Sequence, residues 1–188
     1  MLAPTSTQSN QEGFVFEQCG PLGTYLEIGA AHPHKWSNTW PLERMGWQGL
    51  SIELDTQYKD AWTRERRNPI YWEDALTFDY AAAVDAHGFG RHLNYLSCDI
   101  DPAPNTFAAL QRVIGQGLSF DCITFEHDRY RYRDADYHTI ATEFLEAHGY
   151  RVAVYDVYWK RPSQVYETWY VRDVHARYPI SYAEWNNI

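Results

Sequence analysis

Gly29 and Glu53 each end a short apolar run, and they are 24 residues apart. A glycine after a first strand lets the backbone approach a ligand, and an acid after a second strand can accept hydrogen bonds from both hydroxyls of a ribose. About 20 residues separate these two positions in a dinucleotide-binding fold. The pair therefore predicts a site for an adenosine-containing ligand. The alternative is an ordinary connection at Gly29 and a solvated Glu53.

Three acids, Asp99, Asp101 and Glu126, follow two later apolar runs. If these runs are neighbouring parallel strands, their ends lie about 5 Å apart, and ionised carboxylates there repel unless a cation or raised pKa values compensate. One solution is Mg²⁺, which could also acidify an acceptor hydroxyl. A second is a metal-free site in which Asp99 or His127 is the general base. In the third, Asp101 caps a helix and Glu126 pairs with an arginine.

The segments that position these residues alternate between two patterns. Five apolar runs are typical of parallel strands covered on both faces: 24–29, 49–54, 70–72, 93–100 and 120–126. Helices are predicted near 58–62, over 105–114 with Asn105 as N-cap, and over 134–148 before Gly149. This alternation predicts an α/β fold with right-handed βαβ units and a doubly wound, Rossmann-like sheet, in which ligands bind beyond the carboxyl ends of the strands.

The two ends of the chain depart from this alternation. Residues 150–160 and 165–173 are aromatic and β-branched, and only "RPSQ" separates them, which predicts an antiparallel hairpin. Residues 1–13 are polar and without periodicity, so we expect a flexible tail. The remainder, 14–188, is expected to be a single domain, because 188 residues with 45% hydrophobic content suit one core.

Charge and composition narrow the class of partner. The formal net charge of −9 opposes a nucleic-acid backbone, so a small or neutral substrate is expected. No long apolar run or signal peptide is visible, which favours a cytoplasmic protein without a membrane partner. Three cysteines without a C-x-x-C pair predict neither a disulfide framework nor a zinc site. The sequence does not indicate an oligomeric state.

Several segments together resemble FkbM-type S-adenosylmethionine-dependent methyltransferases, in matching order over about residues 22–172. The similarity begins with "YLEIGA" and "SNTWPLERMGWQGLSIEL", which contain the first two predicted strands. It continues through "YLSCDID", "ITFEHD", "FLEAHGY" and "YETWYV". The resemblance implies a class I methyltransferase sheet of seven strands, with the last one antiparallel.

The resemblance also implies the cofactor and its contacts. Gly29 and Ala30 would line the methionine end of S-adenosylmethionine, Glu53 would hold the ribose, and Asp74 with Ala75 would hold the adenine. The full set of expected cofactor contacts is Glu27, Gly29, Ala30, Asn38, Glu53, Leu54, Asp74, Ala75 and Asp99. The acceptor would be a hydroxyl of a small molecule or glycan, with the segments 30–37, 102–105 and 127–136 at the pocket rim.

The loop "AHPHKW" at 31–36 departs from the family pattern, because Pro33 lacks an N–H donor and the extra glycines of relatives are missing. A non-catalytic domain that binds an adenosyl ligand or a partner is therefore one alternative function. The other is a Rossmann oxidoreductase, although "GAAHPHKW" does not supply the G-x-G-x-x-G motif. His32 and His34 could polarise a substrate, but we interpret them as solvent-exposed loop residues.

Overall fold

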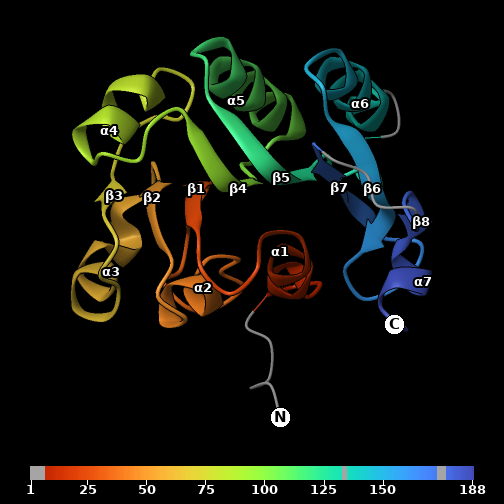
Figure 1. Cartoon of the computed structure of the whole chain (residues 1–188), viewed down its shortest axis with the longest axis horizontal. Helices are drawn as coiled ribbons and strands as arrows, with labels where there is room; N and C mark the ends of the chain where they lie inside the picture. Colours follow the sequence, from red (N-terminus) through yellow and green to blue (C-terminus); the bar gives the residue numbers. More distant parts are fainter. Residues whose placement is uncertain (1–6, 133–134, 173–176) are drawn as a thin grey trace.

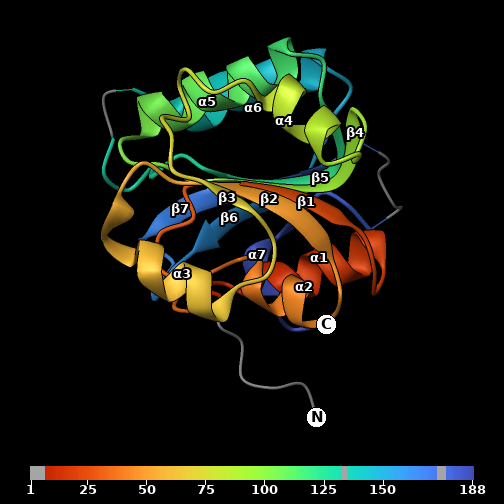
Figure 2. The same ribbon diagram turned by 90° about the vertical axis from the view of Figure 1, so that its left-hand side faces the viewer.

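The computed structural model describes residues 7–132, 135–172 and 177–188. These residues form a three-layer structure in which one sheet lies between two layers of helices (Figures 1 and 2). The strands are β1 Thr24–Ile28, β2 Gln48–Ile52, β3 Ile70–Tyr71, β4 His92–Cys98, β5 Ser119–Glu126, β6 Arg151–Tyr158, β7 Val165–Val171 and β8 Ile180–Ser181. The helices are α1 Gln11–Cys19, α2 Trp40–Arg44, α3 Lys59–Glu65, α4 Tyr80–Ala86, α5 Ala103–Gly115, α6 Tyr137–Ala147 and α7 Tyr182–Trp185, with a 3₁₀ turn at Thr56–Tyr58.

The described strands form an eight-stranded sheet in the order β3-β2-β1-β4-β5-β7-β6-β8. From β3 to β5 all pairs are parallel, whereas β7 runs antiparallel to both β5 and β6. Successive strands are added toward one edge of the sheet from β1 to β3 and toward the other edge from β4 onward, so the strand order switches between β1 and β4. In doubly wound sheets, ligands bind at this switch point. The predicted fold class, a mostly parallel Rossmann-like sheet closed by an antiparallel hairpin, is confirmed.

Each face of the sheet has its own apolar core. Helices α4, α5 and α6 cover one face, where Leu110 and Leu145 pack among buried strand residues such as Ile28 and Phe125. Helices α1, α2, α3 and α7 lie on the other face, where the ring of Phe14 is 4.8 Å from that of Trp169. Strands covered on both faces need apolar side chains in both directions, which explains the continuous apolar runs in the sequence.

The predicted helices at 105–114 and 134–148 correspond to α5 and α6, and the expected left-handed Gly149 has φ 85°. The predicted N-cap of α5 is wrong: Asn105 lies inside the helix, whose N-cap is Pro102 without a side-chain bond. Asp136 caps α6 by accepting from the Thr139 N–H. Position 134, where this helix was predicted to begin, lies outside the described residues.

The predicted tail over 1–13 is wrong for its second half, since residues 1–6 lie outside the described residues but Thr7 onward packs on the sheet. Ser9 and Gln11 are 3% and 1% exposed, and α1 begins at Gln11. Thr7 donates to the Glu12 carboxylate. Polar side chains are buried here through hydrogen bonds, so no hydropathy pattern identifies the segment. No helix in the described part of the chain combines the length and apolar character needed to cross a bilayer.

Candidate functional site at the carboxyl edge of the sheet

The strand register places four predicted residues in one row across the sheet. Ile28 pairs with Ile52 and with Cys98, and Cys98 pairs with Phe125. The residues that follow these partners therefore lie side by side at the carboxyl edge: Glu53, Gly29, Asp99 and Glu126. Glu126 in turn pairs directly with Glu167 on the antiparallel strand β7. An acidic row thus crosses the switch point of the sheet.

Gly29 is required by the close approach of two backbones. Its φ is +86°, and a Cβ at this position would lie 1.6 Å from the carbonyl oxygen of Asp99. Its N–H donates to the carbonyl of Ile52, while the Asp99 N–H donates to the carbonyl of Ile28. The ends of β1, β2 and β4 are held together at this point, and only glycine fits the space.

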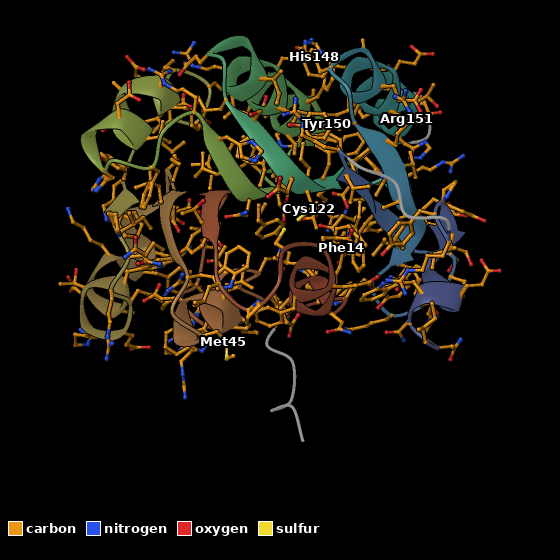
Figure 3. All side chains as sticks on the ribbon, viewed as in Figure 1. Phe14, Met45, Cys122, His148, Tyr150 and Arg151 are labelled. Atoms are coloured by element: carbon orange, nitrogen blue, oxygen red, sulfur yellow. The ribbon has the colours of Figure 1, made fainter. Side chains whose placement is uncertain are left out.

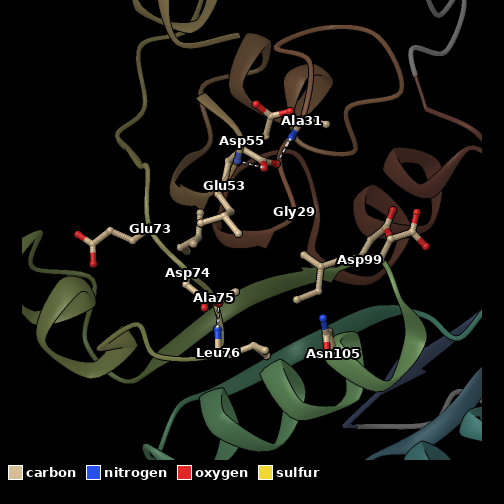
Figure 4. Close-up of a pocket in the computed structure, with 14 residues that line it drawn as sticks. Gly29, Ala31, Glu53, Asp55, Glu73, Asp74, Ala75, Leu76, Asp99 and Asn105 are labelled. Carbon is tan, nitrogen blue, oxygen red and sulfur yellow. Dashed lines mark hydrogen bonds between the residues drawn. The ribbon is translucent and has the colours of Figure 1, made fainter. Parts of the chain in front are cut away.

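Glu53 has a fixed carboxylate. One oxygen accepts the N–H of Ala31 at 2.7 Å, and the other accepts the N–H of Asp55 at 2.8 Å (Figure 4). Each carboxylate oxygen has two acceptor sites, so both oxygens can accept a further hydrogen bond from a ligand hydroxyl. The Ala31 carbonyl accepts from the Trp62 indole at 2.8 Å, which fixes the loop on the other side.

A pocket of about 470 Å³ lies over this edge (Figure 4). It is lined by Gly29, Ala31, Ile52, Glu53, Leu54, Asp55, Glu73, Asp74, Ala75, Leu76, Asp99, Ile100, Asp101 and Asn105. Six of these described lining residues are acidic, and none is Lys, Arg or His. The Leu54 side chain is 67% exposed, so it offers an apolar surface that a flat ring system could cover. The pocket attracts cations and repels phosphates.

Six predicted cofactor residues line this pocket: Gly29, Glu53, Leu54, Asp74, Ala75 and Asp99. Glu27 in β1, and Ala30 and Asn38 in the loop that follows it, do not line the pocket, and all three are buried. Glu27 accepts from the Ser51 hydroxyl at 2.7 Å, and burial raises its pKa. The Asn38 amide donates to the Ser97 hydroxyl at 3.1 Å, while its buried Oδ1 has no partner among the described residues. This oxygen is an unused acceptor near the end of β1.

Asp99 and Glu126 form a carboxyl pair. Burial raises the pKa of Asp99 to about 6, and a hydrogen bond from Glu126 acts in the opposite direction. Burial and the neighbouring Asp99 charge raise the pKa of Glu126 well above its usual range. Glu126 is therefore the member of the pair that keeps its proton, and its hydroxyl donates a hydrogen bond to the Asp99 carboxylate. Burial raises the pKa of the adjacent Glu167 to about 8.

The structure does not form the predicted three-carboxylate metal site. Strand β4 ends at Cys98, so the period-2 alternation that would align Asp101 with Asp99 does not continue. The Asp101 side chain is 73% exposed and pairs with Arg131. Within residues 7–132, 135–172 and 177–188, no group of three His, Cys, Asp or Glu side chains could hold a metal ion. The raised pKa values of Asp99 and Glu126 favour a protonated Glu126 beside Asp99, which lowers the repulsion between the two carboxyl groups.

His127 does not line the pocket either. It is 1% exposed, its Nε2 lies 3.1 Å from the Thr168 hydroxyl, and its Nδ1 accepts from the Arg129 N–H. Burial lowers its pKa to about 3, so the ring is neutral. Both ring nitrogens therefore already have hydrogen-bond contacts within the protein. The rim segment predicted at 127–136 includes positions 133 and 134, which lie outside the described residues.

Sequence reasoning missed Arg66, which organises the loop at 31–39. Its guanidinium donates to five acceptors: Glu43 Oε2, the Pro33 carbonyl, and the hydroxyls of Ser37, Tyr25 and Thr39. Arg66 is 7% exposed, whereas Arg64 and Arg67 are exposed. No local pattern in "RERR" separates the three arginines, so only the tertiary structure identifies the buried one.

The loop histidines have structural contacts. His32 Nδ1 accepts the N–H groups of His34 and Lys35. The His34 ring stacks on Trp40 with centroids 4.2 Å apart, and its Nδ1 lies 3.1 Å from Glu65. These contacts hold the loop at 31–36 against α2 and α3.

Comparison with known proteins supports the fold. No family model matches the sequence, and no curated protein matches it. Among solved structures, the chain is similar to Burkholderia thailandensis 1,6-didemethyltoxoflavin-N1-methyltransferase with bound 1,6-didemethyltoxoflavin and S-adenosylhomocysteine, with TM-score 0.58 and 13% identity over 88% of this chain and 77% of that one. It is also similar to human methyltransferase-like protein 13 in complex with S-adenosylhomocysteine, with TM-score 0.53 and 16% identity over 97% and 83%. A DUF574 family protein from Streptomyces avermitilis matches with TM-score 0.53 and 12% identity over 87% and 80%. The chain therefore has the Rossmann-like fold of methyltransferases.

Proposed function

We propose that this protein transfers a methyl group from S-adenosylmethionine to a small-molecule acceptor. The observation that carries the proposal is the acidic pocket at the switch point, where Glu53 is fixed and the described lining contains no basic side chain. S-adenosylmethionine has a ribose, a cationic sulfonium and an ammonium group, but no phosphate. Its charge therefore suits this lining.

The proposed cofactor contacts follow the order of the strands. Glu53 accepts the ribose hydroxyls, and Asp74 and Ala75 hold the adenine beyond β3, with Leu54 against the ring. The methionine part lies beyond Gly29, toward Asp99, whose carboxylate can face the ammonium group. The buried Glu27 supports this end through the loop. When bound, the cofactor supplies an electrophilic methyl group.

We infer that Asp99 is the proton acceptor for the attacking group. Asp99 lines the pocket, and the proton held by Glu126 keeps it ionised above about pH 6. A hydroxyl on a small molecule or sugar is the proposed acceptor, as in the FkbM-type enzymes that the sequence resembles. Methyl transfer needs mainly alignment of the nucleophile with the methyl group, so one positioned carboxylate is sufficient.

The competing oxidoreductase function requires the pocket to hold a dinucleotide. The pyrophosphate of such a cofactor carries two negative charges and normally binds N–H groups at a glycine-rich helix start. Here it would face Glu53, Asp55 and Asp99. The charge of the lining therefore favours S-adenosylmethionine.

Calorimetric titration of the whole protein with S-adenosylhomocysteine, S-adenosylmethionine and NAD tests the proposal. We expect binding of both sulfur ligands and none of NAD; binding of NAD alone would overturn it. A second assay follows the transfer of a labelled methyl group from S-adenosylmethionine to compounds in a small-molecule extract. Transfer would show an enzyme, and its absence together with ligand binding would indicate a non-catalytic binding domain.

A further inference from the structure

Two cysteines far apart in the sequence lie in contact on the face of the sheet opposite α4, α5 and α6. The Cys19 Sγ at the end of α1 is 3.6 Å from the Cys122 Sγ in the centre of β5. Figure 3 places Cys122 between β5 and α1. Both thiols are free, and the third cysteine, Cys98, is buried beside the Thr106 carbonyl. The two sulfurs are at van der Waals distance, and a bond between them requires about 2.04 Å.

We propose that Cys19 and Cys122 form a reversible disulfide when the protein meets a disulfide oxidant of the glutathione class. The contact itself provides the high effective concentration that favours an intramolecular bond over a mixed one. The chain also allows the remaining approach. Gly20 follows Cys19 with φ +80°, and a side chain there would meet nothing within 4 Å, so the end of α1 has room to adjust.

The exposure of the two sulfurs sets the order of the steps. Cys19 is half-buried and Cys122 is fully buried, so Cys19 meets the oxidant first. Its thiolate attacks oxidised glutathione and expels one glutathione thiolate. Deprotonated Cys122 then attacks the Cys19 sulfur of the mixed disulfide and expels the second glutathione. Two protein thiols lose two electrons and two protons, and one glutathione disulfide becomes two thiols.

Burial raises the pKa of Cys122, so the second step should accelerate as the pH rises. The bond would join α1 covalently to β5. Helix α1 also carries Gln11, whose amide donates to the Glu167 carboxylate at 3.0 Å and to the Tyr166 hydroxyl at 2.9 Å. Oxidation would therefore restrain the helix that packs against Glu167, the member of the acidic row on β7.

The test is thiol counting on the full chain after equilibration over a series of reduced-to-oxidised glutathione ratios. After acid quench, denaturation and alkylation, intact mass should change from three alkylated cysteines to one in a single step, and peptide mapping should recover residues 19 and 122 joined. Cys19→Ser should keep both of its thiols at every ratio. The matched variant Cys98→Ser should lose both of its thiols at the same ratio as the unmodified chain.

A second measurement is the midpoint of thermal unfolding. Because the bond closes a loop of about 100 residues, the midpoint should rise by about 10 to 20 °C on oxidation, in the unmodified chain and in Cys98→Ser only. Retention of three alkylatable thiols at every ratio would overturn the proposal. Stable glutathione on Cys19 with Cys122 still free, or cross-linked dimers in place of an internal bond, would overturn it equally.

Discussion

A side chain at Gly29 would collide with the backbone of Asp99, since its Cβ would lie 1.6 Å from that carbonyl oxygen. Gly29→Ala should therefore force the ends of β1 and β4 apart, with a loss of about 3 kcal/mol or more from overpacking and positive φ together. Urea unfolding followed by tryptophan fluorescence measures this loss. Binding of S-adenosylhomocysteine should disappear as well.

Gly20 provides the matched control for Gly29. Its φ is +80°, close to that of Gly29, but an added Cβ would meet nothing within 4 Å. Gly20→Ala should therefore cost only the backbone strain, about 1–3 kcal/mol, and leave ligand binding intact. Equal losses in the two variants would mean that the contact with Asp99 is not the reason for a glycine at position 29.

Glu53→Ala should weaken S-adenosylhomocysteine binding more than tenfold. Hydrogen bonds to a charged group contribute about 1.5–3 kcal/mol, and the substitution also frees the N–H groups of Ala31 and Asp55 that hold the loop. Calorimetry measures the affinity. Glu73→Gln is the control, because Glu73 also lines the pocket but is exposed, and Figure 4 shows its side chain pointing away from Glu53. An unchanged affinity in Glu53→Ala would place the ribose elsewhere.

The sheet could be predicted well because its strands are continuous apolar runs that stop just before Gly29 and Glu53 and at Glu126. Residues next to a predicted strand end, such as Asp55 and Ile100, could have been included in the pocket on the same reasoning. Helix α1 could not be predicted from the sequence, because its buried polar side chains bond to residues more than 150 positions away, as Gln11 does to Glu167.

The site was predicted less completely than the fold, for a related reason. Whether Asp99, Asp101 and Glu126 share a metal ion or a proton depends on where β4 stops, and an apolar pattern locates a strand end only to within a few residues. The strand ends at Cys98, which leaves Asp101 exposed beside Arg131. One or two residues at a strand end thus decide the chemistry of the pair.

The affinity for S-adenosylmethionine should depend on pH through Asp99. The pKa of Asp99 is raised to about 6, so its charge is lost as the pH falls through 6, and attraction for the cationic sulfonium falls with it. Unit charges 4 Å apart interact by about 4 kcal/mol at an effective dielectric constant of about 20, and a third of this across the pocket corresponds to about tenfold in affinity. S-adenosylhomocysteine, with a neutral sulfur, should change much less between pH 5 and pH 8.

Substitutions at Glu126 test why the affinity for S-adenosylmethionine has the midpoint of its pH dependence near 6. Glu126→Gln keeps a hydrogen-bond donor to Asp99, so the midpoint should stay near pH 6. Glu126→Ala removes the donor and should raise the midpoint, because burial of the Asp99 charge is then less compensated. Asp99→Asn should abolish the pH dependence. Identical profiles for Glu126→Gln and Glu126→Ala would show that the two carboxyl groups do not share a proton.

Arg66→Ala should destabilise the protein strongly, since it leaves the Glu43 carboxylate without its ion-pair partner. Arg66 Nε lies 2.7 Å from Glu43 Oε2, and the two side chains are 1% and 6% exposed. Breaking a buried ion pair on one side costs about 3–5 kcal/mol. Binding of S-adenosylhomocysteine should weaken in parallel, because the Pro33 carbonyl loses its bond to Arg66 and the loop beside Ala31 is released.

The neighbouring Arg67 provides the matched control for Arg66, because it has the same side chain but is exposed. Arg67→Ala should change the free energy of unfolding by less than about 0.5 kcal/mol and leave the ligand affinity unaltered. Urea unfolding and calorimetry on both variants measure the difference. If the two arginines behave alike, the buried hydrogen bonds of Arg66 do not hold the loop beside Ala31, and the Trp62 indole bond to the Ala31 carbonyl is the remaining support to test.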